Sequence, residues 1–582
     1  MSWPLIEKVK RQLNREIGTV YKAPGSALPV ALLYPNTYSL GMSNLGFLTI
    51  YHHLNLRSDV MCERFFLPDH HDLAEYTRTN STLFSYEHQL PLAGFSVVGA
   101  ALSFELDYVN FLKMLALGKI PLPAAERDES HPLVIAGGPA ATFNPEPLAD
   151  FVDAFIIGEG EETVQRVIDA YQAWRAAGEA KSGLRSRLAA LPGVYVPALY
   201  EVTYDSRGVI SGFTPQEGAP AKIRRCWVKA LDAYPAYSCI LTPDTEFGSM
   251  FLVEITRGCG RHCRFCMAGY CYRKPRHRSL EQILETIKLG LPYRKKFGLV
   301  GAAVSDYPAI DELCEALMKL DVQISVASLR ADSLTESLVA ALARSGHKTI
   351  TLAPEAGSER LRRVINKGVT EGDIIRAVKL ARDHGIGNVK LYFIIGFAQE
   401  RAEDIEGIVS LTVLLHDLMA ADGRRAGKIT LRINPFIPKP FTPFERQAMA
   451  GQKEIEQKTD YIAKQLKKYK NVELIFESPK WAMVQAALAR GDRRLGPVLL
   501  AVLNGGGGIA AWKRAFSARN LSMDFFGRRT RPAGEYLPWQ HLDMGMDPAY
   551  LAAEAEKAGR EEPTPPCPSG PCLRCGVCAT GG

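Results

Sequence analysis

The stretch Thr256-Arg-Gly-Cys-Gly-Arg-His-Cys-Arg-Phe-Cys-Met267 decides how the rest of this chain is interpreted. Its three cysteines, Cys259, Cys263 and Cys266, have the spacing C-x3-C-x2-C and follow an alternating apolar segment that predicts a strand. Three thiolates on a tight loop can bind three irons of a cubane [4Fe–4S] cluster, whereas ordinary electron-transfer clusters have four cysteine ligands. The fourth iron would be open to a substrate or cofactor, so the spacing indicates a catalytic cluster.

A zinc site is the alternative for this loop, because structural zinc takes Cys and His ligands and His262 and Cys271 lie nearby in sequence. Phe265 directly precedes the third cysteine and completes the pattern C-x3-C-x-aromatic-C. This pattern resembles that of the radical S-adenosylmethionine (SAM) enzymes. The resemblance implies that the three cysteines bind the catalytic cluster and that Cys271 does not.

Length and composition predict a multidomain globular protein. The chain has 582 residues, which suggests about three or four domains. No apolar run approaches the ~18 residues that span a bilayer, and residues 1–18 lack the apolar region of a signal peptide. We therefore expect a cytoplasmic protein without a membrane partner. The net charge of +7 permits an RNA or phosphate-bearing partner without requiring one.

Alternation of strands, glycine-rich loops and helices predicts an α/β protein with several parts. The first large part is expected to be a Rossmann-like doubly wound sheet, and the second a partial (β/α)6 barrel of the TIM type. The expected boundaries are 1–29 for an N-terminal lead, 30–175 for the Rossmann-like domain, 176–246 for a connector, 247–448 for the barrel, 449–545 for a helical region and 546–582 for a Cys-rich tail.

Two glycine-rich loops follow predicted strands of the first domain, where glycine lets the backbone approach a ligand. Their candidate ligand-binding residues are Gly137, Gly138, Thr142, Gly158 and Gly160. In this order the loops resemble the N-terminal domain of cobalamin-binding radical SAM proteins, which implies a cobalamin cofactor. The D-x-H-x-x-G motif that places a histidine under cobalt is absent, so such a cobalamin would not be ligated through that motif. A domain that no longer binds cobalamin is the alternative.

Six strands are expected in the barrel, near residues 251–256, 298–304, 323–328, 348–353, 388–395 and 428–434. Barrel active sites lie at the carboxyl ends of the strands. The polar or glycine residues expected there are Ser305, Asp306, Ser328, Arg330, Glu355, Ser358 and Gly396. Ser279 and Gln282 fit a capping box that opens the first barrel helix.

The resemblance to radical SAM enzymes assigns tasks to several of these residues. Phe265 would pack near the adenine of SAM, Glu355 and Ser358 would lie where the family contacts the ribose or carboxylate, and Gly396 belongs to a segment that meets adenine through its backbone. Ser305 and Asp306 stand where the family often has a Gly-Gly-Glu motif, from which this chain departs. Capping of the barrel rim is the alternative for each of these residues.

Two further stretches carry charge or sulfur. Arg273-Lys-Pro-Arg-His-Arg278 is expected to be a solvated loop covering the cluster, with phosphate binding as the alternative. Four cysteines fall within 12 residues of the tail and indicate a metal site, either a second iron–sulfur cluster, which we favour, or a zinc knuckle. These tail cysteines are Cys567, Cys572, Cys575 and Cys578.

Nearly the whole chain resembles a poorly characterised group of B12-binding-domain radical SAM proteins. The resemblance implies an enzyme that cleaves SAM to a 5′-deoxyadenosyl radical, with cobalamin-linked methyl transfer to an unactivated carbon. A small-molecule reductant, flavodoxin or ferredoxin would supply the electron, and the substrate is left open, RNA or protein included. The alternatives are sulfur insertion into tRNA or protein, as in methylthiotransferases, and a cobalamin or redox sensor without turnover.

Overall fold

The chain forms two compact units, each assembled from segments that are distant in sequence. The computed structural model describes residues 2–421, 426–568, 570 and 572–578, so the Cys-rich tail is described only in part. The first unit comprises Met1–Ser249, Leu488–Ser522 and Ala533–Gly545, and the second comprises Met250–Ala487, Met523–Pro532 and Met546–Gly582. The region expected to be a helical block at 449–545 is thus divided between the two units.

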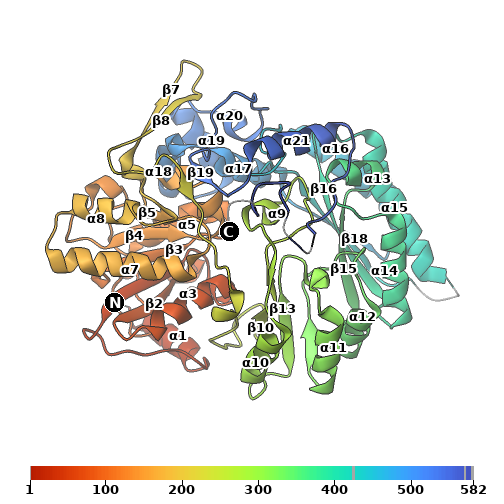
Figure 1. Ribbon diagram of the computed structural model, residues 1–582, viewed down its shortest axis with the longest axis horizontal. Helices are drawn as coiled ribbons and strands as arrows, with labels where there is room; N and C mark the ends of the chain where they lie inside the picture. The colour runs from red at the N-terminus through yellow and green to blue at the C-terminus, as the bar shows by residue number, and fades with distance from the viewer. Residues whose placement is uncertain (1, 422–425, 569, 571, 579–582) are drawn as a thin grey trace. The chain divides into compact units, whose positions relative to one another are not determined.

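The first unit contains a six-stranded sheet with the order β2-β1-β3-β4-β5-β6 (Figure 1). Its first five strands are parallel, and β6 is antiparallel to β5. The order 2-1-3-4-5 is that of a doubly wound sheet, so the expected fold class is confirmed for this unit. The strands are β1 (Leu28–Tyr34), β2 (Val60–Phe66), β3 (Val97–Ala101), β4 (Leu133–Gly137), β5 (Ala154–Ile156) and β6 (Val194–Tyr195).

Helices cover both faces of this sheet. On one face α3, α7 and α8 pack against Val30, Leu32 and Tyr34 of β1, while α5 packs against α18, which comes from far along the chain. Short strand pairs complete the unit: β7 (Tyr200–Tyr204) with β8 (Ile210–Pro215), and β9 (Ile223–Arg224) with β19 (Leu542–Asp543). The helices are α1 (Trp3–Leu13), α2 (Tyr38–Gly41), α3 (Leu45–Leu56), α4 (His70–Thr79), α5 (Tyr108–Leu117), α6 (Pro139–Phe143), α7 (Gly160–Ala177), α8 (Lys181–Ala189), α18 (Gly496–Asn504) and α19 (Ile509–Ala518).

The second unit is an open barrel of parallel strands. Two sheets, β10-β13-β14 and β15-β16-β17-β18, are joined by a parallel bridge between Leu329 and Leu352. Alternate side chains of β16 and β17 are buried, as expected for strands with helices on their outer face. The strands are β10 (Met250–Glu254), β13 (Lys296–Val300), β14 (Gln323–Ser325), β15 (Thr349–Glu355), β16 (Asn388–Ile395), β17 (Ile429–Pro435) and β18 (Val472–Phe476).

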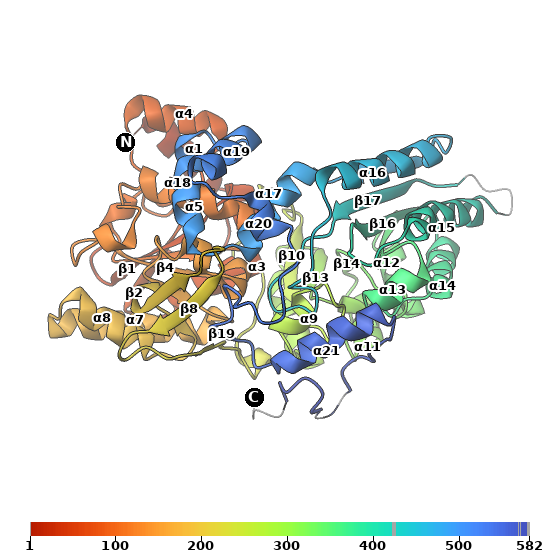
Figure 2. The same cartoon turned by 90° about the horizontal axis from the view of Figure 1, so that it is seen from above.

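Helices alternate with these strands and pack outside them (Figures 1 and 2). Ser279 caps α10 by accepting a hydrogen bond from the Gln282 amide, but the Gln282 side chain reaches Thr286, so only half of the expected capping box forms. The helices are α9 (Ala268–Cys271), α10 (Leu280–Gly290), α11 (Ile310–Lys319), α12 (Glu336–Arg344), α13 (Glu359–Val364), α14 (Glu371–Asp383), α15 (Ala402–Ala420), α16 (Gln452–Leu466), α17 (Pro479–Arg490), α20 (Met523–Gly527) and α21 (Pro548–Gly559).

The six predicted barrel strands are confirmed within a few residues, but a seventh strand, β18, was not predicted from the sequence. β18 pairs with β17 in parallel and lies inside the region expected to be mainly helical. Its alternation is weak, because several of its side chains are exposed at the edge of the sheet.

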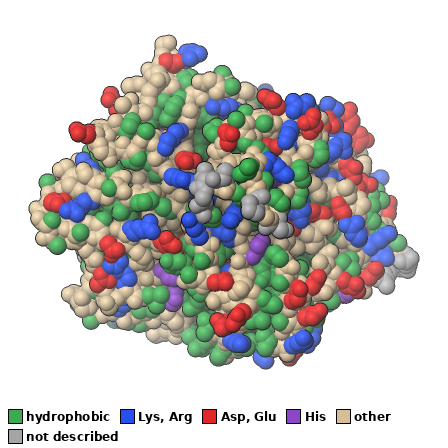
Figure 3. Space-filling model, in the orientation of Figure 1, with side chains coloured by type: hydrophobic (Ala, Val, Ile, Leu, Met, Phe, Trp, Pro, Cys, Tyr) green, Lys and Arg blue, Asp and Glu red, His purple; other side chains and the backbone are tan. Residues whose placement is uncertain are grey.

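Two surface properties agree with the composition. Within the described residues, no helix is long and apolar enough to cross a membrane. Acidic and basic side chains are interspersed on the face shown in Figure 3, as a net charge of only +7 predicts.

Candidate functional site

The three-cysteine loop is closed by a short antiparallel pair. β11 (Thr256–Arg257), directly after β10, pairs with β12 (Arg276–His277) and brings the two ends of the loop together. Gly258 has φ +80°, and a Cβ there would lie 2.1 Å from the Tyr272 carbonyl oxygen. The loop can therefore close in this way only with glycine at position 258.

The three thiols of this loop lie close enough to influence one another. Cys263 is buried, and Cys259 and Cys266 are partly buried. Burial, together with the neighbouring Cys263 and Cys259 sulfurs, raises the pKa of Cys266 to about 12. Burial and Cys263 likewise raise the pKa of Cys259. The fold thus gathers three thiols at the carboxyl end of the first barrel strand.

Cationic side chains surround these sulfurs. Arg261, inside the loop, forms ion pairs with Asp306 at 2.5 Å and Asp332 at 2.9 Å, and Arg330 pairs with Asp332 at 3.0 Å. Burial works against the Arg330 charge, but the Cys263 sulfur and Asp332 raise its pKa overall. The site therefore holds a fixed positive charge beside the thiols.

Ser305 and Asp306 belong to this network. The Ser305 hydroxyl oxygen accepts a hydrogen bond from the Arg330 amide and lies 2.9 Å from the Ser333 hydroxyl. Burial opposes ionisation of Asp306, but its hydrogen bonds and charge contact with Arg261 lower its pKa overall. Both residues lie at the predicted rim position and are held there by other side chains of the rim.

Glu355 ends β15 in a left-handed backbone conformation, with φ +66°, where the register with β16 shifts. Its carboxylate lies 3.3 Å from the Lys367 ammonium. Burial raises the pKa of Glu355, and Lys367 opposes the rise. Lys367 also acts electrostatically on Cys266. Lys367 was not predicted as a site residue, because it follows α13 and belongs to no recognisable motif.

The remaining predicted rim residues are held by backbone hydrogen bonds, packed in an apolar cluster or exposed. Ser358 caps α13, accepting from the Leu361 amide at 3.0 Å, and Gly396 has φ +90° and donates its N–H to Glu400. Phe265 packs edge-on against Phe397 in an apolar cluster with Phe436 and Phe444. Ser328 is exposed, unlike the buried Arg330 that follows it.

The basic stretch at 273–278 is not a solvated loop, so this prediction was wrong. Arg273, Arg276 and Arg278 are buried, and only Lys274 and His277 are exposed. Arg278 forms an ion pair with Glu254 at the end of β10. The stretch is covered because it returns the loop to the barrel through β12, which carries its arginines inward.

Comparison with known proteins agrees with this geometry. Residues 253–412 match the Radical SAM superfamily, and residues 46–197 match the family described as Radical SAM proteins, N-terminal. The chain belongs to the radical SAM superfamily. It is 32% identical over 481 residues to the uncharacterized protein MJ0966 of Methanocaldococcus jannaschii, covering 81% of this chain and 90% of that protein.

Two further similarities are more distant. An uncharacterized methyltransferase of Pyrococcus horikoshii, PH0819, is 26% identical over 305 residues, which cover 49% of this chain and 58% of that protein. Among solved structures, the radical SAM methyltransferase TsrM from Kitasatospora setae aligns with a TM-score of 0.46 and 15% identity, covering 74% of this chain and 76% of that one.

Membership of the radical SAM superfamily implies SAM and a [4Fe–4S] cluster. Three mutually interacting thiols on one loop are the donor set that such a cluster requires, so the residues of this loop fit the group. Among the described residues, this loop included, no three His, Cys, Asp or Glu side chains are already placed so that they could hold a metal ion.

The glycine-rich loops of the first unit pack against their own chain. A Cβ at Gly158 would lie 2.0 Å from the Cys226 carbonyl oxygen, and one at Gly138 would lie 2.8 Å from the Leu102 carbonyl oxygen. Gly160 begins α7, and the Gly158 amide donates to the Thr142 hydroxyl at 3.0 Å. Internal packing is thus a sufficient reason for glycine at 138 and 158, and cobalamin binding by these loops stays a prediction.

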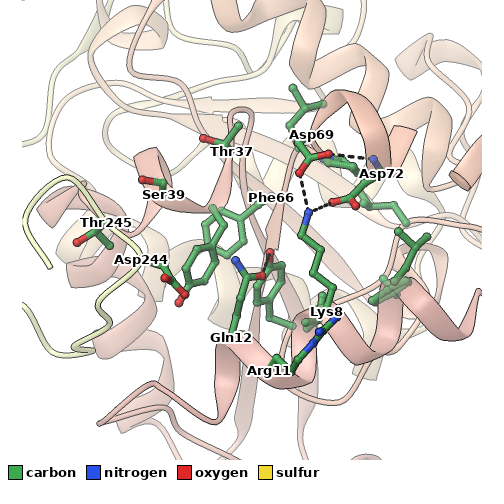
Figure 4. Close-up of a pocket in the computed structure, with 18 of the residues that line it drawn as sticks. Lys8, Arg11, Gln12, Thr37, Ser39, Phe66, Asp69, Asp72, Asp244 and Thr245 are labelled. Atoms are coloured by element: carbon green, nitrogen blue, oxygen red, sulfur yellow. Dashed lines mark hydrogen bonds and ion pairs between the residues drawn. The ribbon is translucent and has the colours of Figure 1, made fainter. Parts of the chain in front are cut away.

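A cavity of about 930 Å³ lies at the carboxyl ends of β1 and β2, beside α1 and α4 (Figure 4). Lys8 reaches Asp69 and Asp72 across its wall, at 2.6 Å each. The predicted glycine loops do not line this cavity, because they follow β4 and β5. Its charged wall residues are largely paired with one another.

The four tail cysteines lie beside the radical SAM loop. Burial raises the pKa of Cys567; Arg273 opposes this, and the other three tail cysteines add to it. The Cys567 amide donates to the Gly260 carbonyl at 2.8 Å, inside the three-cysteine loop. The side chain of Asn366, which no sequence motif predicted, donates to the carbonyls of His262 at 3.1 Å and Thr564 at 3.0 Å.

Proposed function

We propose that this radical SAM protein is an enzyme in which Cys259, Cys263 and Cys266 bind three irons of a [4Fe–4S] cluster. The observation that carries the proposal is the clustering of these three thiols beside Arg330 and Lys367 at the carboxyl ends of the barrel strands. When bound, the cluster supplies one electron that breaks a carbon–sulfur bond of SAM, giving methionine and a 5′-deoxyadenosyl radical.

The chain's own residues would provide charge and shielding. Arg330 and Lys367 offset the negative charge of the cysteinate ligands, since each interacts with one of the three sulfurs. Glu355 and Ser358 are proposed to contact the ribose or amino-acid part of SAM, with Ser305, Asp306, Ser328 and Gly396 as further candidates. Phe265 and its aromatic neighbours offer an apolar wall for adenine and exclude water from the radical.

Cys263→Ala should abolish 5′-deoxyadenosine formation, because it removes one of three iron ligands. After anaerobic reconstitution with iron and sulfide, the variant should also bind about four fewer irons per chain than the unmodified protein. The measurements are iron content and 5′-deoxyadenosine release from SAM with dithionite as reductant. Retention of SAM cleavage in the variant would show that this loop does not hold the catalytic cluster.

Cys314→Ala is the matched control for this experiment. Cys314 is also a buried cysteine of the same unit, but it lies on α11 among barrel-packing residues and far from the loop in sequence. Its replacement should leave both iron content and 5′-deoxyadenosine release unchanged.

We propose methyl transfer as the reaction that uses the radical. The support is similarity to a protein described as a methyltransferase, over about half of each chain. Cobalamin is proposed as the methyl carrier from the sequence resemblance, with the doubly wound sheet of the first unit as the element that would bind it. Cobalt analysis of protein reconstituted with hydroxocobalamin tests this part separately from SAM cleavage.

Radical SAM enzymes commonly need an external electron donor, and a flavodoxin or ferredoxin is the donor class we propose here. Sulfur insertion, the alternative chemistry, would transfer sulfur to the product instead of a methyl group alone. The sensor alternative predicts that SAM binds without release of 5′-deoxyadenosine. Release by the unmodified protein in the Cys263→Ala experiment would therefore exclude a sensor without turnover.

A further inference from the structure

The loop of the first three cysteines and the four-cysteine tail meet at His262. We propose that the tail cysteines hold a second iron–sulfur cluster and that His262 donates its Nε2 proton to the Cys567 sulfur, linking this cluster to the catalytic loop. The inference deepens the proposed function and rests on it in one respect, namely that the loop carrying His262 is the loop that binds the catalytic cluster.

The backbone brings the two groups together. The Cys567 amide donates to the Gly260 carbonyl at 2.8 Å, and a Cβ on Gly260 would lie only 3.1 Å from the Cys567 Cβ. Asn366 holds both segments, because its amide group donates to the His262 and Thr564 carbonyls and accepts from the Thr564 amide at 2.8 Å. Cys567 is therefore fixed next to the residue that follows Cys259.

His262 is oriented toward the tail. Its backbone has φ +58°, a conformation uncommon for a residue other than glycine, and its side chain is buried. The Nε2 atom lies 3.4 Å from the Cys567 sulfur, a distance suited to an N–H···S hydrogen bond. The two residues are 305 positions apart in sequence.

The partners of the other ring nitrogen decide which nitrogen carries the proton. Arg273 lies 2.9 Å and the Tyr550 hydroxyl 2.5 Å from Nδ1. A guanidinium group can only donate hydrogen bonds, and a phenol hydroxyl can donate one as well, so both partners are satisfied when Nδ1 accepts. Nδ1 must therefore accept, which places the proton of the neutral ring on Nε2, where it faces the sulfur. A metal bound through Nε2 would need the proton on Nδ1, directed at Arg273, so the geometry favours a donor over a ligand.

The surroundings suit a redox centre. Cys575 is 4% exposed and packs with Tyr270 and Tyr550, and the buried ion pair of Arg264 with Glu554 ties α21 to the loop. The Arg273 charge acts on the Cys567 and Cys575 sulfurs. Hydrogen bonds to ligand sulfur and nearby positive charge both raise the reduction potential of an iron–sulfur cluster. Zinc, which has no redox change, would gain nothing from adjacency to the catalytic loop.

The test uses the full chain with C259A, C263A and C266A combined, so that only the tail can bind a cluster. After anaerobic reconstitution we expect about four irons and the electron paramagnetic resonance signal of a reduced cluster. His262→Leu in this background should lower the midpoint potential, shifting the reduction equilibrium about tenfold, or about 59 mV for one electron. His262→Gln, which keeps an N–H donor, should restore most of the shift.

His347→Leu serves as the control, because His347 contacts the Ile324 carbonyl away from both cysteine groups. Zinc in place of iron in the tail, or equal potentials in the Leu, Gln and unsubstituted proteins, would overturn the proposal. If the triple variant does not fold, the same series in C263A alone gives the same comparison. If the triple variant binds no cluster in its tail while the unmodified protein cleaves SAM normally, this inference is refuted and the proposed function stands.

Discussion

At the scale of single residues, short spacing was readable from sequence and long-range pairing was not. Cys259, Cys263 and Cys266 lie within eight positions, so their spacing alone indicated that they act together. Lys367 and Asn366 carry no motif, and their roles arise because the fold places them beside Glu355 and His262. The basic stretch was misjudged for the same reason, since charge patterning cannot tell a solvated arginine from Arg273, which the fold buries.

Lys367→Met should make stability fall with rising pH. Burial already raises the pKa of Glu355, and removal of Lys367 takes away the charge that opposes the rise. A carboxyl group with a raised folded-state pKa binds its proton more tightly in the folded protein than in the unfolded one. Its contribution to stability is therefore full below the unfolded pKa of about 4.3 and is lost as the pH rises through the folded-state pKa. The expected loss at pH 8, relative to the unsubstituted protein, is on the order of 3 kcal/mol.

Thermal unfolding of iron-free protein at pH 5 and pH 8 measures this effect. The double variant Lys367→Met/Glu355→Gln should lose the added pH dependence, because no carboxylate then remains to be buried. The assigned pairing of Lys367 with Glu355 would be contradicted if the melting temperatures of Lys367→Met and of the unsubstituted protein changed equally with pH.

At the scale of elements, periodicity predicted the central strands well and the peripheral ones poorly. β16 alternates strictly between buried and partly buried residues and was predicted at its observed bounds. β18 lies at the sheet edge with several exposed side chains and was missed. The described residues after α21 form no helix or strand, so the attachment of residues 562–568 to the loop depends on hydrogen bonds with Asn366 and not on a periodic pattern.

Asn366→Ala should loosen the attachment of the tail to the loop. The substitution removes the side-chain donations to the carbonyls of Arg261, His262 and Thr564 and the acceptance from the Thr564 amide, so these backbone groups lose this partner. Amide hydrogen exchange over residues 562–568 should accelerate at least tenfold, while exchange in β16 and β17 stays unchanged.

Asn471→Ala is the control for this measurement. Its side-chain amide also donates to a backbone carbonyl, that of Gly427, but Asn471 directly precedes β18 and lies away from the tail in sequence. Unchanged exchange at 562–568 in Asn366→Ala would show that the tail is held by other contacts.

At the scale of the whole molecule, the first unit is completed by a segment from the far end of the chain. Arg493 pairs with the fully buried Glu146 at 2.9 Å and donates to the Tyr195 hydroxyl at 3.1 Å. Asn144 donates to the Gly491 carbonyl at 2.7 Å. The stretch 489–496 therefore fastens residues 488–522 to the unit that contains the doubly wound sheet.

Arg493→Met should destabilise the first unit by about 3–5 kcal/mol, because it leaves the Glu146 carboxylate buried without its partner. Thermal unfolding should show an earlier transition, and the double variant with Glu146→Gln should recover part of the loss. Arg519→Met, at an exposed position after α19, should leave the transition where it is. Equal melting temperatures for Arg493→Met and Arg519→Met would refute the role of this pair.

The sequence by itself determined the fold class, the barrel strands and the three-cysteine pattern, because strand periodicity and ligand spacing are local properties. Only the tertiary structure decided that the arginines of 273–278 are buried, that Lys367 accompanies Glu355, and that Cys567 lies against Gly260. These contacts join positions far apart in the chain, and which of them form depends on how helices and strands pack. The two cysteine groups, separate in sequence, thus become neighbours in the folded protein.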